Sequence, residues 1–373
     1  MDFALSEEQR LLRDSAERFV RENYPFEKRR AMAASEEGFS REHWRQMAEL
    51  GWLMLPFPED DGGLGGGAAE VMLLMEAFGR GLVLEPYLSS ILLAGRLLAA
   101  LGDAAQRAAH LPALMEGRSL AALAFAEPQG RYDLAAVTTR AARNGDGWRL
   151  DGRKSVVLGG AAADLFLVTA RVDGEADLAA FLLPADAAGL LVQGYPTSDG
   201  GRAAELELAN VQLEARARLS AAPVRAALEA VIDGATAAIC AEAVGIMEAA
   251  TAATREYLRT RRQFGRPLAA FQVLQHRLAD MVVACEEMRS LTIAANLAVD
   301  GDDAAERARA VSAAKAELGR RGTYVVAQAV QLHGGMGVSD ELDIASHFKR
   351  LHVLNALFGD RDHHLRRYAA RAA

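Results

Sequence analysis

Cysteine and aromatic residues are scarce in this sequence, and acidic residues outnumber basic ones. Only Cys240 and Cys285 occur among 373 residues, both inside apolar stretches with helical spacing. This argues against a disulfide framework and predicts buried thiols in a reducing compartment, so a cytoplasmic protein is expected. The net charge is −8 and basic residues are scattered among acidic ones, so the clustered basic face that nucleic acids require is missing.

Long uninterrupted hydrophobic runs are missing too. The longest apolar candidate, Gly234 to Ala253, contains Glu242 and Glu248, and two carboxylates in so short a stretch argue against a membrane span. The first ten residues have no basic leader followed by an apolar run, so no signal peptide is expected. Hydrophobic residues make up 51% and charged residues 25% of the chain, which predicts a soluble protein of two or three domains.

Secondary-structure signals divide the chain into three parts. Residues 1–117 are expected to be α-helical, because Ser6 and Gln9 have capping-box spacing and apolar residues follow at helical intervals. Residues 118–222 contain short strand-like runs separated by Gly and Asp, which predicts a small antiparallel β domain. Residues 223–373 predict a four-helix bundle. Its expected helices are Val224–Thr260, Ala269–Val299, Ala304–Leu332 and Asp340–Ala372.

The first motif that carries chemistry runs from Arg261 to Gly265, at the predicted end of a long helix. Arg binds phosphate through two hydrogen bonds and stacks on flat π-systems, so Arg261 beside Phe264 suits a diphosphate joined to a ring system. The same residues also fit a solvated basic helix end that the helix dipole favours.

The second motif comprises Gln331, His333 and the run Gly334-Gly335-Met336-Gly337. Glycines let a backbone come close to a ligand and expose its N–H groups. Taken alone, such a glycine run is usually just a turn.

The order and separation of these motifs resemble the acyl-CoA dehydrogenase family across nearly the whole chain. The resemblance implies an α+β fold with an N-terminal α-helical domain, a middle antiparallel β domain and a C-terminal four-helix bundle. It also implies FAD as cofactor, an acyl-CoA substrate, and an electron-transfer flavoprotein or similar electron acceptor. Further matches are Ser6-Glu7-Glu8-Gln9, Leu50-Gly51-Trp52, Pro58-Glu59, Gly62-Gly63-Leu64-Gly65, Glu127-Pro128 and Gly152-Arg153-Lys154.

By the same resemblance, eight residues of this chain are expected to bind FAD. In the family they belong to the subunit that reaches the nucleotide part of its neighbour's cofactor. The eight are Arg261, Gln263, Phe264, Leu268, Gln272, Gln331, Gly334 and Gly335.

The catalytic base that the resemblance implies is missing from its usual place. The family removes the α-proton of the thioester with a Glu, and the matching position is Phe358, which cannot take a proton. Members that place the Glu on the first bundle helix would have it where this chain has Ala235 and Thr236. Glu242 lies roughly two helical turns later and is expected to make an ordinary helix or subunit contact. Asp360 stays open as a displaced base, since burial could raise its pKa.

Side chains that hold the flavin ring in the family are also replaced. Ala126 and Tyr132 stand where the family has Thr and Ser, while Val156 and Leu158 stand where it has Trp and Thr. The chain thus resembles the small, non-catalytic subunit of α2β2 heterotetramers such as pimeloyl-CoA or steroid side-chain acyl-CoA dehydrogenases. Its partner would be a paralogous subunit that carries the base.

Two alternatives remain open. One is an active homo-oligomer that uses Asp360 or another non-standard base, and the other is a flavin-free binding or scaffold protein with the same fold. A metal cluster is not expected, because neighbouring ligands on one helix point in different directions. The residues considered for a metal are Asp360, Asp362, His363 and His364.

Overall fold

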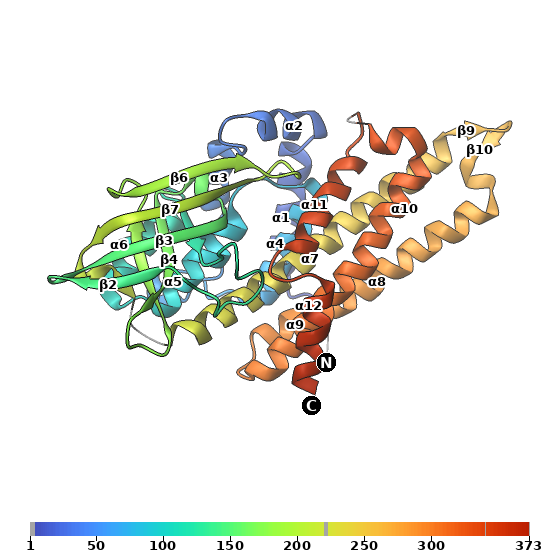
Figure 1. Cartoon of the computed structure of the whole chain (residues 1–373). Coiled ribbons are helices and arrows are strands. Elements are labelled where there is room, and N and C mark those ends of the chain that lie inside the picture. Colours follow the sequence, from blue (N-terminus) through green and yellow to red (C-terminus); the bar gives the residue numbers. More distant parts are fainter. Residues whose placement is uncertain (1–3, 220–222, 340, 373) are drawn as a thin grey trace. The chain divides into compact units, whose positions relative to one another are not determined.

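The computed structural model of the chain (Figure 1) describes residues 4–219, 223–339 and 341–372. The chain forms two compact units, and each unit combines separate stretches of sequence. The first unit comprises Met1–Ala31, Gly67–Val83 and Thr236–Ala373, and the second comprises Met32–Gly66 and Leu84–Ala235. The predicted division at residues 1–117, 118–222 and 223–373 stays a prediction.

The first unit is helical, and local capping explains where its first helix begins. Ser6 Oγ accepts the N–H of Gln9 at 3.1 Å and Gln9 Oε1 accepts the N–H of Ser6 at 3.0 Å, which confirms the predicted capping box. The helices of this unit are α1 (Glu7–Asn23), the start of α2 (Phe26–Ala34), α4 (Ala68–Gly81), most of α7 (Val224–Thr260), the 3₁₀-helix η5 (Leu268–Ala270), α8 (Gln272–Val299), α9 (Ala304–Glu317), the π-helix η6 (Leu318–Gly322), α10 (Thr323–His333), the 3₁₀-helix η7 (Gly334–Val338), α11 (Ile344–Ala356) and α12 (Arg361–Ala372).

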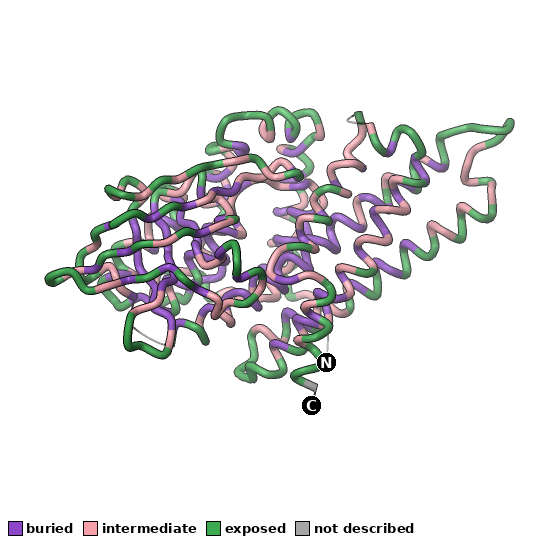
Figure 2. The backbone as a smooth tube through the Cα atoms, viewed as in Figure 1, coloured by how far each residue is buried: buried purple, intermediate pink, exposed green. Residues whose placement is uncertain are grey.

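Helix α7 is long and apolar enough to cross a membrane by length and composition. However, 89% of its most apolar window is buried, as in the core helix of a soluble protein (Figure 2). Cys240 and Cys285 are both free thiols and both buried.

The last predicted helix is wrong in one respect. Instead of one helix, the structure has α11 and α12 with a break between Ala356 and Arg361. Phe358 and Gly359 have φ angles of +58° and +123°, which an α-helix cannot accommodate. Asp340, where the predicted helix begins, lies outside the described residues.

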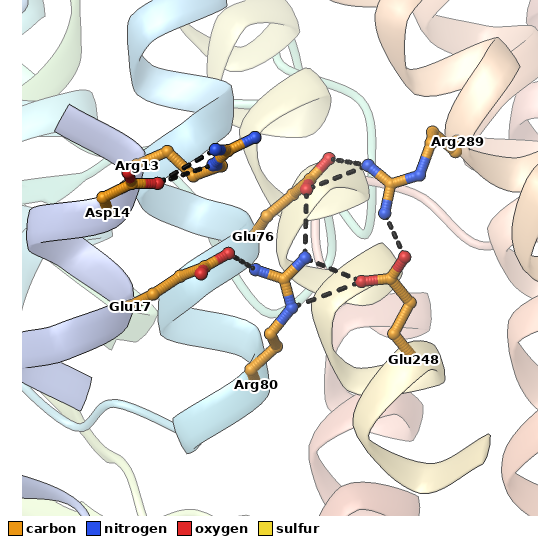
Figure 3. Close-up of polar contacts among 7 residues, drawn as sticks. All are labelled: Arg13, Asp14, Glu17, Glu76, Arg80, Glu248 and Arg289. Atoms are coloured by element: carbon orange, nitrogen blue, oxygen red, sulfur yellow. Dashed lines mark hydrogen bonds and ion pairs between the residues drawn. The ribbon is translucent and has the colours of Figure 1, made fainter. Parts of the chain in front are cut away.

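Helices α4 and α7 approach each other through a pair of glycines. A Cβ on Gly79 would lie 2.0 Å from the carbonyl oxygen of Glu242, and a Cβ on Gly245 would lie 2.0 Å from that of Glu76. Either side chain would therefore force the two backbones apart. Around this crossing, ion pairs join α1, α4, α7 and α8 (Figure 3). The residues in them are Glu17, Glu76, Arg80, Glu248 and Arg289.

The second unit contains a sheet with the order β6-β7-β3-β2-β4-β5-β8, to which β1 is added beside β4. Most pairs are antiparallel, as predicted, but β1 and β2 both run parallel to β4, so the sheet is mixed. Buried side chains on the sheet form a core that includes Trp148, Phe166 and Phe181. The strands are β1 (Ala121–Ala124), β2 (Arg140–Asn144), β3 (Gly147–Leu158), β4 (Leu165–Val172), β5 (Leu178–Pro184), β6 (Leu190–Pro196), β7 (Arg202–Leu213) and β8 (Arg218–Leu219).

Short helices complete the second unit. Ser40 caps one of them by accepting the N–H of His43 at 3.2 Å. They are the end of α2, α3 (Arg41–Glu49), the 3₁₀-helices η1 (Glu59–Asp61), η3 (Gly160–Ala162) and η4 (Ala215–Ala217), the π-helix η2 (Tyr87–Gly95), α5 (Arg96–Leu101), α6 (Ala104–Met115) and the first turns of α7.

Candidate cofactor-binding site

The stretch after α7 forms a small hairpin at the far end of α7 and α8 (Figure 1, upper right). Its strands are β9 (Arg262–Gln263) and β10 (Arg266–Pro267), and Gln263 pairs with Arg266. Arg261 lies where the hairpin closes, because its carbonyl accepts the N–H of Leu268 at 2.8 Å.

The turn of this hairpin displays an aromatic ring to the surroundings. Phe264 and Gly265 have φ angles of +52° and +78°, the combination that a two-residue type I′ turn requires. Asn or Asp is the usual residue at the first position, so Phe264 occupies a strained conformation and is still 88% exposed. Its ring meets that of Phe271 edge to face, with centroids 6.0 Å apart, but is not packed into the core.

The hairpin region is strongly basic. Five arginines occur between residues 255 and 266, where Glu256 is the only acidic residue. Arg261 and Arg262 are exposed and form no ion pair within the described residues. Their guanidinium groups are therefore available to an anion, and the bidentate geometry of Arg suits phosphate oxygens.

The space around the glycines that follow α10 shows whether a ligand fits against their backbone. A Cβ on Gly334 or Gly335 would meet no atom of the described chain within 4 Å. Gly334 has a φ of +63°, but Gly335 has no positive φ, so within the described residues neither backbone conformation nor packing requires glycine at position 335. Gly337, in contrast, is required by packing, since its Cβ would lie 2.5 Å from the carbonyl of Val330. The backbone at Gly334 and Gly335 therefore borders open space, so a ligand such as a nucleotide can approach it closely without meeting a side chain of this chain.

The remaining predicted cofactor residues lie on the same unit. Gln263 is exposed on β9, Leu268 is half-buried directly after β10, and Gln272 is the exposed first residue of α8. Gln331 is exposed on the last turn of α10. The end of α10 meets the end of α7, because the ring of His333 stacks on the ring of Tyr257 with centroids 4.4 Å apart. The structure therefore brings the two predicted segments to the same end of the helices.

Phe358, at the expected base position, lies in the loop between α11 and α12. A buried lysine holds this loop, since Lys315 Nζ donates to the carbonyls of Asn355 at 2.8 Å and Gly359 at 2.6 Å. Burial lowers the pKa of Lys315 to about 8, although the nearby Cys240 and Asp360 oppose the shift. The sequence did not predict the role of this lysine. Its only sequence signal is a charged residue on the otherwise buried face of a helix.

His364 supports the same loop from α12. Its Nε2–H donates to the carbonyl of Phe358 at 3.2 Å, and its Nδ1 lies 3.3 Å from Ser312 Oγ. Burial lowers the pKa of His364 to about 3, and the Lys315 charge adds to the effect. The imidazole is therefore neutral.

Asp360 and Glu242, the two carboxylates near the expected base positions, both have hydrogen-bonding partners within the chain. Asp360 Oδ1 accepts the backbone N–H of His363 at 2.8 Å, which is the contact of a helix N-cap at the start of α12. Glu242 forms a bidentate pair with Arg350 of α11, with contacts of 2.5 and 2.9 Å, and is 3% exposed. The contact expected for Glu242 is thus one within the chain. Ala235 and Thr236, at the alternative base position, are both buried.

Among the described residues, no group of three or more His, Cys, Asp or Glu side chains is arranged to hold a metal ion. The rings of His363 and His364 lie edge to face with centroids 5.1 Å apart, which is an aromatic contact.

In the second unit, a saturated carboxylate fixes the loop that carries Ala126. Glu127 accepts hydrogen bonds from the backbone and side chain of both Thr138 and Thr139, and from Lys154 Nζ at 2.8 Å. Burial would raise the pKa of Glu127, but the Lys154 charge and these hydrogen bonds outweigh it, so the pKa is lowered. The N–H of Ser155 then donates to the carbonyl of Ala126 at 3.0 Å.

Val156 stands in a β-bulge next to this lysine, and its backbone is strained. Its φ is +51°, an outlier for a β-branched residue, and its side chain is 49% exposed. Its N–H donates to Glu205 Oε1 at 3.2 Å, and Tyr195 Oη donates to the same oxygen at 3.0 Å. Ala126, Tyr132 and Leu158 are half-buried. The backbone frame is well fixed, while the side chains at positions 126, 156 and 158 offer no hydrogen-bonding group.

Comparison with known proteins shows the family to which the chain belongs. Family models for the acyl-CoA dehydrogenase N-terminal, middle and C-terminal domains match residues 6–118, 122–215 and 224–373. The chain therefore belongs to the acyl-CoA dehydrogenase family, whose members are FAD-dependent oxidoreductases that act on acyl-CoA.

Relatives match along almost the full length of the chain. A probable acyl-CoA dehydrogenase, YngJ of Bacillus subtilis (strain 168), is 30% identical over 355 residues, covering 92% of each chain. The ChsE4–ChsE5 complex of Mycobacterium tuberculosis contains a chain that is 29% identical with a TM-score of 0.90, covering 100% of this chain and 99% of that one. A glutaryl-CoA dehydrogenase of Mycobacterium smegmatis in complex with FADH2 shares the fold, at 24% identity and a TM-score of 0.90, covering 99% of this chain and 95% of that one.

Proposed function

We propose that this chain is the supporting subunit of a heteromeric FAD-dependent acyl-CoA dehydrogenase. It provides the nucleotide half of a FAD site to a paralogous subunit, and that partner carries the base. The observation that carries the proposal is the pairing of two open segments at helix ends that the Tyr257–His333 stack joins. One segment has the exposed Arg261 and Phe264, and the other has the Gly334-Gly335 backbone, which borders open space.

Each proposed contact follows from the chemistry of the side chain. Arg261 binds the diphosphate, Phe264 packs on a flat ring system, and the Gly334-Gly335 backbone lies against the nucleotide. Gln263, Leu268, Gln272 and Gln331 line the same site. Bound FAD supplies the hydride acceptor of the desaturation.

The proposal also accounts for the absence of a base. Phe358 carries no ionisable group, Asp360 caps α12, and Glu242 is neutralised by Arg350. The chain is thus expected to bind and orient the cofactor and to leave proton abstraction to its partner. An α2β2 heterotetramer in the cytoplasm, with an acyl-CoA substrate and an electron-transfer flavoprotein or similar acceptor, fits this division. The complex of two Chs chains among its structural relatives supports the heteromer.

Flavin content tests the proposal directly. The chain is purified alone and after co-expression with a paralogous acyl-CoA dehydrogenase subunit, and bound FAD is measured by absorbance. We expect a colourless chain alone and about one FAD per heterodimer in the complex. One FAD per chain without a partner would favour the active homo-oligomer, and no FAD in either preparation would favour the flavin-free scaffold.

Two variants sharpen the result. Arg261→Ala should lower FAD occupancy of the complex, whereas Arg216→Ala, which removes another exposed arginine, should not. Phe358→Glu in the isolated chain should give no turnover, because a carboxylate alone does not restore the flavin contacts missing at Ala126 and Val156. Turnover by that variant would contradict the proposed division of labour.

A further inference from the structure

An aromatic stack joins the two helix ends from which the proposed cofactor segments leave. Tyr257 on α7 and His333 on α10 stack with centroids 4.4 Å apart and planes inclined by 29°. Tyr257 lies one turn before Arg261, and its carbonyl accepts the Arg261 N–H at 2.8 Å. His333 directly precedes Gly334. The stack therefore sets the distance between the base of the hairpin and the start of the glycine run.

The orientation of the imidazole in this stack is fixed. His333 is 4% exposed, and its Nδ1 lies 2.8 Å from the carbonyl of Ala329. A carbonyl can only accept, so Nδ1 carries the proton and donates it. Burial also lowers the pKa of His333, so the ring is neutral and presents its flat face to Tyr257.

A second contact ties the third helix of the site to the same point. Arg277 Nε on α8 donates to Gln328 Oε1 on α10 at 2.7 Å. Arg277 follows Gln272 by five residues, and Gln328 precedes Gln331 by three. Each helix that carries proposed cofactor residues is thus joined to α10 within about two turns of those residues.

Three of the four side chains in these contacts lie at the margin of the buried interior. Tyr257, Arg277 and Gln328 are half-buried and His333 is buried, whereas Met281 of α8 and Val325 of α10 are fully buried apolar side chains. Loss of the stack should therefore leave the helices folded and release their ends.

We propose that Tyr257 and His333, with the Arg277–Gln328 bond beside them, act as a clamp that positions the Arg261–Gly265 and Gly334–Gly335 segments for the nucleotide half of FAD. The clamp rests on the proposed function. Its members are positioning residues that act through the segments they hold. Hydrogen bonds and stacking in a binding site gain affinity when the groups are held in place beforehand, because less freedom is lost on binding.

The test compares Tyr257→Leu with Tyr257→Phe in the co-expressed complex, and FAD is titrated into the deflavinated protein. Loss of an aromatic stack of this kind should weaken FAD binding about fivefold to tenfold for Tyr257→Leu, and Tyr257→Phe should bind as the wild type does. The melting temperature of Tyr257→Leu should stay within about 2 °C of the wild-type value. His333→Gln should reproduce the effect.

A matched control exists in the same unit. Phe348 and His352 on α11 also form an aromatic–imidazole pair, 4.2 Å between centroids, that holds no proposed cofactor segment. Phe348→Leu should leave FAD affinity unchanged. In the isolated chain, amide hydrogen exchange at residues 261–268 and 334–338 should be faster in Tyr257→Leu than in the wild type and unaffected by Phe348→Leu.

The outcomes separate the clamp from the function on which it rests. If Arg261→Ala weakens FAD binding and Tyr257→Leu does not, the clamp is refuted while the proposed function stands. If neither change affects FAD, both fail. If Tyr257→Leu and Phe348→Leu lower FAD affinity and melting temperature alike, the stack contributes only to general stability, and the clamp is again refuted.

Discussion

Gly245→Ala probes the crossing of α4 and α7 more directly than any loss of a side chain. The new Cβ would lie 2.0 Å from the carbonyl oxygen of Glu76 and 2.9 Å from its carbonyl carbon. Carbon and oxygen atoms in contact stay about 3.3 Å apart, so the two backbones would have to separate by about 1 Å. The obstacle is backbone on both sides, so no rotamer change can relieve it.

That displacement would also strain the ion pairs around the crossing (Figure 3). Arg289 bonds Glu76 at 2.8 Å, and Arg80 joins Glu248 of α7 at 2.7 Å. Overpacking of this kind costs about 1 to 3 kcal/mol, and we expect the upper end because the pairs lengthen as well. For a unit of this size, about 3 kcal/mol corresponds to a melting temperature lower by about 6 to 12 °C.

Gly301→Ala is the matched control. A Cβ on Gly301 would have the carbonyl oxygen of Ala298, 3.5 Å away, as its nearest neighbour, and Gly301 has no positive φ. This variant should differ from the wild type by less than about 0.5 kcal/mol in guanidinium-induced unfolding. If Gly245→Ala unfolded at the same denaturant concentration as Gly301→Ala, the close approach of α4 and α7 would be refuted.

Three further changes test other parts of the chain. Lys154→Met leaves the buried Glu127 carboxylate without its cation, so urea unfolding should show a loss of about 3 to 5 kcal/mol, and an unaffected variant would refute the pairing. Because the pKa of His364 is about 3 in the folded chain, the unfolded chain binds more protons between about pH 3 and 6.5. The free energy of unfolding should therefore fall by about 2 kcal/mol when the pH is lowered from 7 to 5. His364→Gln should reduce this dependence of stability on pH. Arg350→Met strands the Glu242 carboxylate and should lower the unfolding free energy by about 3 kcal/mol, whereas an unchanged transition would show that the pair contributes nothing.

Local sequence rules predicted the beginnings and kinds of most elements. The Ser6 capping box begins α1, and the strand-like runs predicted within residues 118–222 include β7, where Leu206 and Leu208 are buried. The break at Phe358 was missed because apolar spacing continues through it, and Gly359 is its only local signal. The pairing of strands also depends on residues far apart in the sequence. Nothing in the short runs of β1 and β2 indicates that both lie parallel to β4.

The candidate site also has parts that the sequence indicates and parts that appear only in the fold. Arg261, Phe264 and Gly335 were named from the resemblance of their motifs to the family, and their role in binding FAD stays a prediction. The stack of Tyr257 on His333 could not be predicted, since the two residues are 76 positions apart and meet only when α7 and α10 pack. Exposure could not be predicted from the sequence either. The projection of Phe264 from a strained turn and the open space beside Gly335 are properties of the fold.

The loop at Phe358 adds a last argument for the divided site. Burying a lysine is costly, and Lys315 is buried in order to hold two backbone carbonyls of this loop. His364 and the Asp360 cap fix the same few residues, including the left-handed backbone at Phe358. The chain's own side chains therefore define the backbone at position 358, although the side chain there cannot abstract a proton. Under the proposed function, we expect the partner subunit to meet a fixed loop here and to supply the base itself.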